Sequence, residues 1–240
     1  MRRNHVLGLV TVAGLAAAAA AHGNGLDIQF SSSGSDGGLW TSNYSANPGA
    51  TVYVRVRMSI EHSFYGISGA RYNIISNNAG GWDVGGNDTV DLTPAKGSAT
   101  DGRYAGFDFG GQTQQVFEGA SSLRIDAKGD TGNNPNAGIS TSQNTPGALG
   151  TNFNTNVDHV PVYKFAIKLS NNPEIGRQII VKILGSEITS FKGYETSSST
   201  AGVQIAGPEG DTGTITVVPA PGVLGAAGLA SVAALRRRRR

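Results

Sequence analysis

Residues 51–60 read Thr-Val-Tyr-Val-Arg-Val-Arg-Met-Ser-Ile, and this stretch is the clearest indication of the fold class. Apolar side chains occupy every second position from Val52 to Ile60, and Tyr53 and two arginines stand between them. Successive side chains of a β-strand point to opposite faces of a sheet, so this alternation predicts a strand with one buried face. The Asn-Pro-Gly sequence at 47–49 is a strong turn signal immediately before the strand.

Shorter stretches elsewhere in the chain show the same alternation. Residues 26–30 and 70–74 each place three apolar or aromatic side chains on one face. Further strands are predicted at 104–109, 123–126, 163–169, 178–184, 203–206 and 212–218. Many short strands, turns rich in Gly, Asn and Pro, and no helical periodicity predict an all-β fold, an antiparallel β-sandwich.

The composition fits a β-rich module that works outside the cytoplasm. Of 240 residues 15% are charged, 35 are glycine and none is cysteine. Without cysteine the chain has no disulfide, thiolate nucleophile or Cys-ligated metal, so core burial must hold the fold. Glycine-rich disorder is the competing interpretation, and the clean alternation argues against it.

The N-terminus predicts a signal peptide over residues 1–21. Two arginines at positions 2 and 3 precede an apolar run from Val6 to Ala21. Ala19 and Ala21 are small residues where signal peptidase cleaves, and polar residues follow. The alternative is a buried alanine-rich helix, which would not need this order of charge, apolar run and small residues.

The C-terminus, residues 219–240, predicts a second targeting signal. Pro219, Ala220 and Pro221 precede an apolar helix at 223–235. Five basic residues end the chain: Arg236, Arg237, Arg238, Arg239 and Arg240. Thirteen helical residues span only about 20 Å of a roughly 30 Å hydrocarbon core, but terminal arginines hold a helix end on the cytoplasmic side.

This order of motif, apolar helix and arginine cluster resembles the PEP-CTERM sorting signal of bacteria that have an exosortase. The resemblance implies transient insertion in the inner membrane, cleavage near the motif and release to the cell surface or extracellular matrix. Signal peptidase and an exosortase-like enzyme would then be processing partners. Ala220 stands where the family has Glu, which leaves open which transpeptidase variant acts, or whether the tail is retained.

The net charge of the body between these ends argues against one class of partner. The two ends hold seven of the 19 Lys and Arg residues and no acid, so the body carries 12 basic against 17 acidic residues, a net charge of −5. Nucleic-acid binding needs clustered Lys and Arg, and we therefore expect no nucleic-acid partner.

The body, residues 22–218, resembles a cohesin-like or carbohydrate-module-like sandwich of jelly-roll type. The matching stretches are 48–58, 66–72 and 213–217. The resemblance implies an adhesive or scaffolding module without an active site. Residues 127–156 give no strand signal and predict a long surface loop, either mobile or ordered by a ligand.

No catalytic residue is predicted, and the chain is not expected to be an enzyme. His62 and His159 match no metal or triad spacing. A glycoside hydrolase, the least favoured alternative, would draw its carboxylate pair from Asp83, Asp88, Asp91, Asp101 and Asp108.

Two binding hypotheses remain beside a structural or adhesive role. Calcium would be bound by loop oxygens, and Asp88, Asp91, Asp126 and Asp130 are the candidate ligands. A polysaccharide would stack on aromatic rings, with Trp40, Tyr44, Tyr65, Trp82 and Tyr104 as candidates. The alternative for the aromatic residues is packing in the sandwich, and the alternative for the acids is ordinary turn chemistry.

Overall fold

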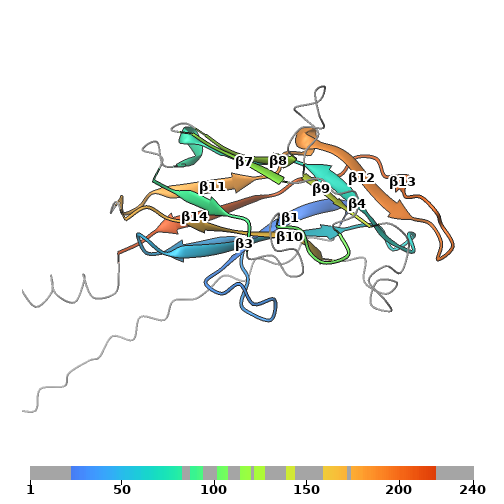
Figure 1. Ribbon diagram of the computed structural model, residues 1–240, viewed down its shortest axis with the longest axis horizontal. Helices are drawn as coiled ribbons and strands as arrows, with labels where there is room; N and C mark the ends of the chain where they lie inside the picture. The colour runs from blue at the N-terminus through green and yellow to red at the C-terminus, as the bar shows by residue number, and fades with distance from the viewer. Residues whose placement is uncertain are drawn as a thin grey trace, which may run out of the picture.

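The computed structural model describes residues 23–82, 87–93, 102–107, 114–119, 122–127, 139–143, 159–171 and 174–219. These residues form two layers of β-sheet packed face to face (Figure 1), which confirms the all-β sandwich. The strands pair antiparallel except for β14 and β2, which run parallel. The predicted signal helix and the helix at 223–235 lie outside the described residues. Within them, no helix combines the length and apolar character needed to cross a bilayer.

The first layer is a four-stranded sheet of order β1-β3-β10-β6. Its members are β1 (Gly25–Ser31), β3 (Thr51–Ser59), β10 (Val160–Lys168) and β6 (Thr89–Asp91). Strand β3 pairs with β1 on one side and β10 on the other. Its alternate residues Val52, Val54, Val56 and Met58 are fully buried, as the sequence pattern predicts.

The second layer consists of two sheets that lie end to end. One has the order β2-β14-β11-β5-β8-β7 and the other β13-β12-β4-β9. The strands of the first are β2 (Asn43–Ala46), β14 (Thr212–Val217), β11 (Gln178–Lys182), β5 (Ile74–Asn77), β8 (Ser122–Ala127) and β7 (Gln114–Gly119). Those of the second are β13 (Val203–Gln204), β12 (Ile188–Tyr194), β4 (Gly66–Tyr72) and β9 (Ile139–Ser142).

The two sheets meet at Asn73, the single residue between β4 and β5. Its buried side-chain amide donates to Glu187 Oε2 at 2.6 Å. Glu187 belongs to the short 3₁₀ turn, Gly185–Glu187, that carries the chain from β11 towards β12. This hydrogen bond therefore links the two places where the chain passes from one sheet of the second layer to the other: Asn73, between β4 and β5, and the turn between β11 and β12.

Several strand predictions need correction. The strand predicted at 70–74 is broken at Asn73, so Tyr72 and Ile74 belong to different sheets. Residues 104–107 form no strand, and only the neighbouring Arg103 makes an isolated bridge, to Tyr163. The expectation that 127–156 lacks strands is wrong at β9, whose sequence Ile-Ser-Thr-Ser is too short and polar to show alternation.

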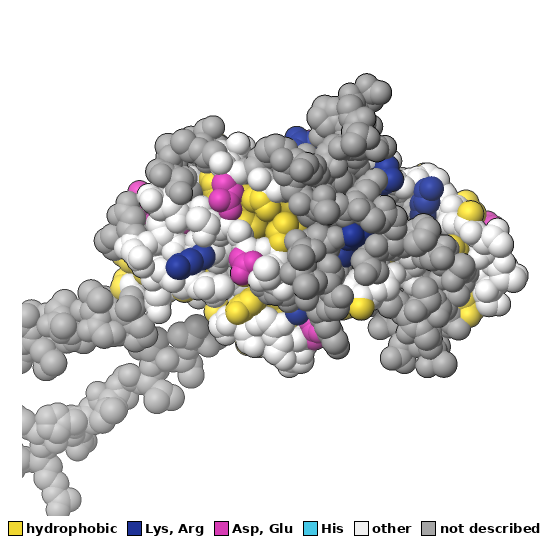
Figure 2. All heavy atoms as spheres, viewed as in Figure 1, with side chains coloured by type: hydrophobic (Ala, Val, Ile, Leu, Met, Phe, Trp, Pro, Cys, Tyr) yellow, Lys and Arg dark blue, Asp and Glu magenta, His cyan; other side chains and the backbone are white. Residues whose placement is uncertain are grey.

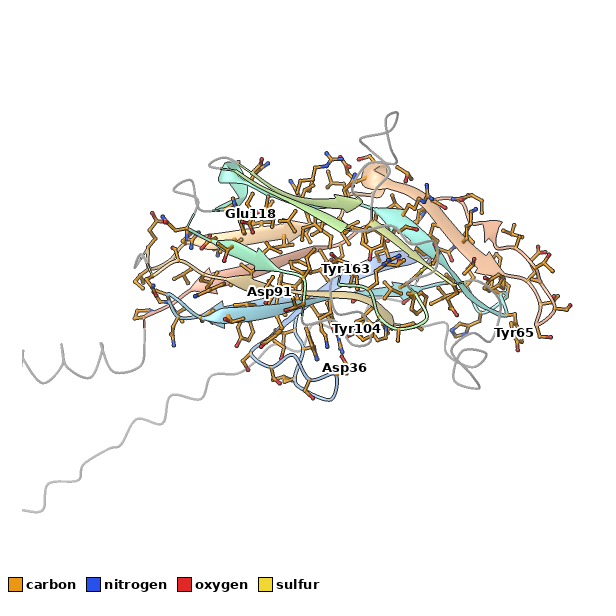
Figure 3. All side chains as sticks on the ribbon, in the orientation of Figure 1. Asp36, Tyr65, Asp91, Tyr104, Glu118 and Tyr163 are labelled. Atoms are coloured by element: carbon orange, nitrogen blue, oxygen red, sulfur yellow. The ribbon has the colours of Figure 1, made fainter. Side chains whose placement is uncertain are left out.

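Carboxylates from the second layer cap both edges of the first layer. Asp211 Oδ2 accepts a hydrogen bond from the backbone N–H of Ile28 in β1 at 3.0 Å. On the opposite edge, the side chain of Glu118 in β7 accepts from the backbone N–H of Val90 in β6 (Glu118 is labelled in Figure 3). Unpaired N–H groups on an edge strand are a template for pairing with another chain. The acids occupy these donors and join the two layers.

Gly213 is predicted to be essential for the contact between the two layers. A Cβ added there would lie 2.3 Å from Cε2 of the fully buried Phe30. Because the ring has no space to move, Gly213→Ala is expected to lower the free energy of unfolding by about 1–3 kcal/mol. Gly37→Ala, with no atom within 4 Å of the added carbon, is the control and should change it little. Equal stability of the two variants in urea would contradict this packing.

Candidate functional site

The aromatic residues proposed as a sugar-binding platform do not form one. Trp82 is 1% exposed, Tyr104 6% and Trp40 8%. A ring must present its face to solvent to stack on a sugar, so these three belong to the packing of the sandwich. Tyr44 and Tyr65 are half-buried, and Figure 3 shows Tyr65 at one end of the molecule, away from Tyr104.

Asp88 forms a buried ion pair rather than an open ligand site. Its Oδ2 lies 2.5 Å from Nη1 of Arg177, and its Oδ1 accepts from Arg177 Nη2 at 3.0 Å and from the Ser170 backbone N–H at 2.7 Å. The Asp88 side chain is fully buried and that of Arg177 is 9% exposed. Both carboxylate oxygens of Asp88 are therefore already bound by the guanidinium. This leaves Asp88 unsuited to bind calcium or to act in a hydrolase.

Of the other acidic candidates, the structure describes the side chain of Asp91 alone. Asp91 is exposed and accepts hydrogen bonds from Thr93. Asp83, Asp101, Asp108 and Asp130 lie outside the described residues, as does the side chain of Asp126. Within the described ranges, no three His, Asp or Glu side chains are placed to hold a metal ion.

His62 and His159 differ in their surroundings. His62 is exposed, whereas Nδ1 of His159 lies 2.9 Å from Asp27 Oδ2. Arg57 Nε donates to the other Asp27 oxygen at 2.8 Å. This cluster joins β1, β3 and the start of β10, so we assign it a structural role.

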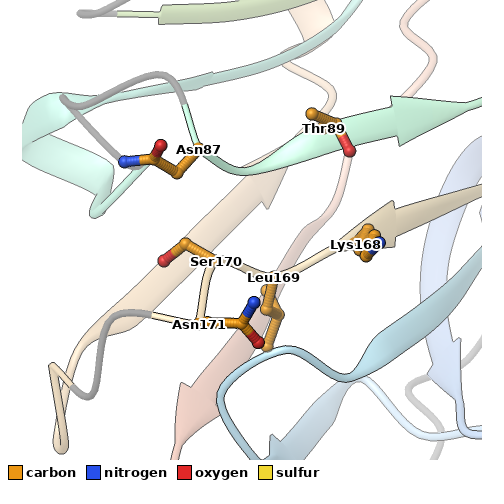
Figure 4. Close-up of a pocket in the computed structure, with 6 residues that line it drawn as sticks. All are labelled: Asn87, Thr89, Lys168, Leu169, Ser170 and Asn171. Atoms are coloured by element: carbon orange, nitrogen blue, oxygen red, sulfur yellow. The ribbon is translucent and has the colours of Figure 1, made fainter.

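A pocket of about 450 Å³ opens beside the Asp88–Arg177 pair, where β6 and β10 part after their last paired residues, Thr89 and Lys168 (Figure 4). The described residues that line it are Asn87, Thr89, Lys168, Leu169, Ser170 and Asn171. Sequence reasoning missed this site, because the two lining segments lie some eighty residues apart and nothing in either segment points to the other.

A second site missed from the sequence is the loop of residues 32–40, here called the 32–40 loop. It follows β1 and lies below the first layer in the view of Figure 1. Trp40 is buried and its indole N–H donates to the Ser35 carbonyl at 3.1 Å, whereas its neighbour Leu39 is 83% exposed. The loop thus presents one large aliphatic side chain to solvent beside a buried aromatic anchor.

Lys164 of β10 binds the 32–40 loop from the side of the sheet. Its side chain is 3% exposed, and Nζ donates to the Gly34 carbonyl at 2.7 Å and to Asp36 Oδ1 at 3.2 Å. The Tyr104 hydroxyl donates to the same Asp36 oxygen at 2.6 Å (Figure 3). Burial, together with the bond to Asp36, raises the pKa of Tyr104 far above its ordinary value.

Arg55 of β3 fixes the other side of the loop. Its guanidinium lies 4.4 Å from the centre of the Trp40 ring and donates to Gln29 Oε1 at 3.0 and 2.7 Å. Burial, and secondarily the charge of Arg57, lower the pKa of Arg55. Both basic side chains are held by several partners, so the loop is rigidly attached to the sheet.

Comparison with known proteins finds similarity only among solved structures. No protein-family model and no curated protein matches the sequence. A cohesin in a type I cohesin–dockerin complex from Clostridium thermocellum is 11% identical and has a TM-score of 0.42, with 81% of this chain and 100% of that chain covered. The sixth cohesin of scaffoldin B from Acetivibrio cellulolyticus, solved with a mutant dockerin, is 16% identical with a TM-score of 0.37, over 82% and 99% of the two chains.

The buried ion pair leads to a stability prediction. Arg177→Met removes the guanidinium that balances the buried Asp88 carboxylate, so the free energy of unfolding should fall by about 3–5 kcal/mol. The double variant Asp88→Leu with Arg177→Met removes both charges and should regain at least half of that loss. Arg71→Met, at an exposed arginine of β4, is the control and should stay within about 0.5 kcal/mol of the wild type. A single variant as stable as this control would show that the pair is dispensable.

The raised pKa of Tyr104 predicts a pH dependence. Above about pH 10 the unfolded chain loses this phenol proton while the folded chain keeps it, so stability present below pH 10 is lost as the pH rises. Tyr104→Phe removes this contribution and should flatten the decline by at most about 1.4 kcal/mol per pH unit. Urea unfolding at several pH values between 9 and 11 measures the slope. An unchanged slope would mean that the phenol is not held protonated.

Proposed function

We propose that this chain is exported and acts at the cell surface or in the extracellular matrix as a non-catalytic, adhesive β-sandwich that is sorted through its C-terminal tail. The observation that carries the proposal is the 32–40 loop, where Leu39 is 83% exposed on a rigidly held backbone. An exposed aliphatic side chain on a preorganised loop loses little entropy on binding, which suits it as an anchor in a protein contact.

The C-terminal strand is paired on both sides up to the start of the predicted sorting tail. Strand β14 ends at Val217, directly before the tail, and pairs with β11 on one side and β2 on the other. The Val218 N–H also donates to the Ala46 carbonyl at 2.9 Å. Cleavage after about Pro221 would therefore leave this pairing intact, which suits a body that is released after sorting.

The surface of the body is consistent with this role. Figure 2 shows charged side chains scattered singly over one face, among uncharged polar groups. The net charge of −5 of the body favours solubility outside the cell. Polysaccharide binding remains the second candidate function, and it needs a site other than the buried tryptophans.

The test measures processing and retention together in the native host. We expect the intact mass of the protein outside the inner membrane to lack residues before about His22 and after about Pro221. Leu39→Asp is expected to shift at least half of this matrix-bound protein into the medium, because a carboxylate cannot enter an apolar contact without a desolvation cost.

Val203→Asp is the matched control, since Val203 is also exposed, at 42%, but lies in β13 at the far end of the second layer. It should leave retention unchanged. Retention of Leu39→Asp at the level of Val203→Asp would overturn the role of the loop. A mass that includes Arg236 to Arg240, found in the membrane fraction, would overturn sorting by cleavage.

A further inference from the structure

The pocket beside the Asp88–Arg177 pair has rigid walls. Asp88 fixes the Ser170 backbone, and the Ser170 carbonyl in turn accepts from the Gly49 N–H at 2.8 Å. Gly49 has a positive φ of 73°, and a Cβ there would lie 2.2 Å from the Asn171 side-chain oxygen. The turn before β3 therefore needs glycine so that Asn171 can lie against it, at the rim of the pocket.

Polar side chains without hydrogen bonds of their own surround this pocket. In the described part of the chain, the side chains of Asn87, Thr89, Lys168, Ser170 and Asn171 make no hydrogen bond to another protein group. Ser170 is only 5% exposed as a residue. Its hydroxyl oxygen is not buried, and it reaches the pocket. The described lining thus offers two hydroxyls, two amides and one ammonium (Figure 4).

The charge of the pocket selects the ligand. Lys168 is exposed and is the only charged residue of the described lining. Asp88, which lies between the lining residues Asn87 and Thr89, is neutralised by Arg177. Among the described lining residues there is no carboxylate for a metal ion, and Leu169 is the one apolar side chain. The site instead offers one positive charge for an anion and several amides and hydroxyls for neutral hydroxyl groups.

We propose that this pocket binds a carboxylate-bearing sugar, a uronic acid unit of an acidic polysaccharide. Lys168 would pair with the carboxylate, and Asn87, Thr89, Ser170 and Asn171 would exchange hydrogen bonds with the ring hydroxyls. The volume of about 450 Å³ lies within the range of small-ligand pockets, roughly 300–1,000 Å³. The inference names a second partner and does not depend on the 32–40 loop.

The experiment is isothermal titration of the protein recovered from its native host with trigalacturonate, cellotriose and inorganic phosphate. Trigalacturonate should bind at least tenfold more tightly than the other two, and its affinity should fall as salt screens the Lys168 charge. Lys168→Ala should weaken binding at least tenfold and Asn171→Ala several-fold. Lys192→Ala, at an exposed lysine of β12 in the other sheet of the second layer, is the control and should bind as the wild type does.

Each other outcome overturns the inference in a distinct way. Equal affinity for cellotriose would show that the carboxylate is not recognised, and equal affinity for phosphate would show that the site binds only an anion. Absence of trigalacturonate binding, or binding that survives Lys168→Ala, would exclude this pocket. Leu39→Asp should leave the titration unchanged, so failure here and failure of the adhesive loop are separable.

Discussion

The carboxylate of Asp88 is the point on which one end of the sandwich depends. It lies just before β6, binds the backbone after β10 through Ser170, and pairs with Arg177, which precedes β11. The Arg177 carbonyl in turn accepts from Val217 N–H at the end of β14 at 2.8 Å. One buried ion pair therefore joins four strands from both layers without a disulfide. The pocket wall at Ser170 and the hydrogen bond at the end of β14 both depend on it.

Local pattern predicts the parts of this fold in which a strand has one buried and one solvent-facing side. Strands β1, β3 and β11 alternate clearly, because each second side chain enters the core. The short strands β2 and β9 do not alternate in hydrophobicity, since their polar residues are held by pairing with distant strands. The break at Asn73 was also hidden, because Tyr72 and Ile74 keep the alternation across it while the hydrogen bonds pass to another sheet.

The candidate sites were harder to predict than the fold, because they too depend on contacts between residues that are distant in the sequence. Asp88 lies in a Gly-rich stretch that suggests a cation loop, and only its partner Arg177, 89 residues later, shows that the charge is satisfied internally. The Ser- and Gly-rich 32–40 loop looks unstructured in sequence, and its order comes from Arg55, Tyr104 and Lys164 on other segments. Tryptophans are a common signal for sugar binding, but burial decides their role, and burial is a property of the assembled layers.

The capped edges of the first layer bear on how many copies of this protein can be held in a small volume. A module proposed to accumulate outside the cell would meet its own kind at high local concentration, with no chaperone supply of ATP to separate mispaired chains. Asp211 and Glu118 already occupy backbone donors of β1 and β6. Two neighbouring copies consequently cannot extend one another's sheets at these donors without first displacing a carboxylate. At these two positions of the first layer, contact between densely packed copies therefore stays confined to side chains.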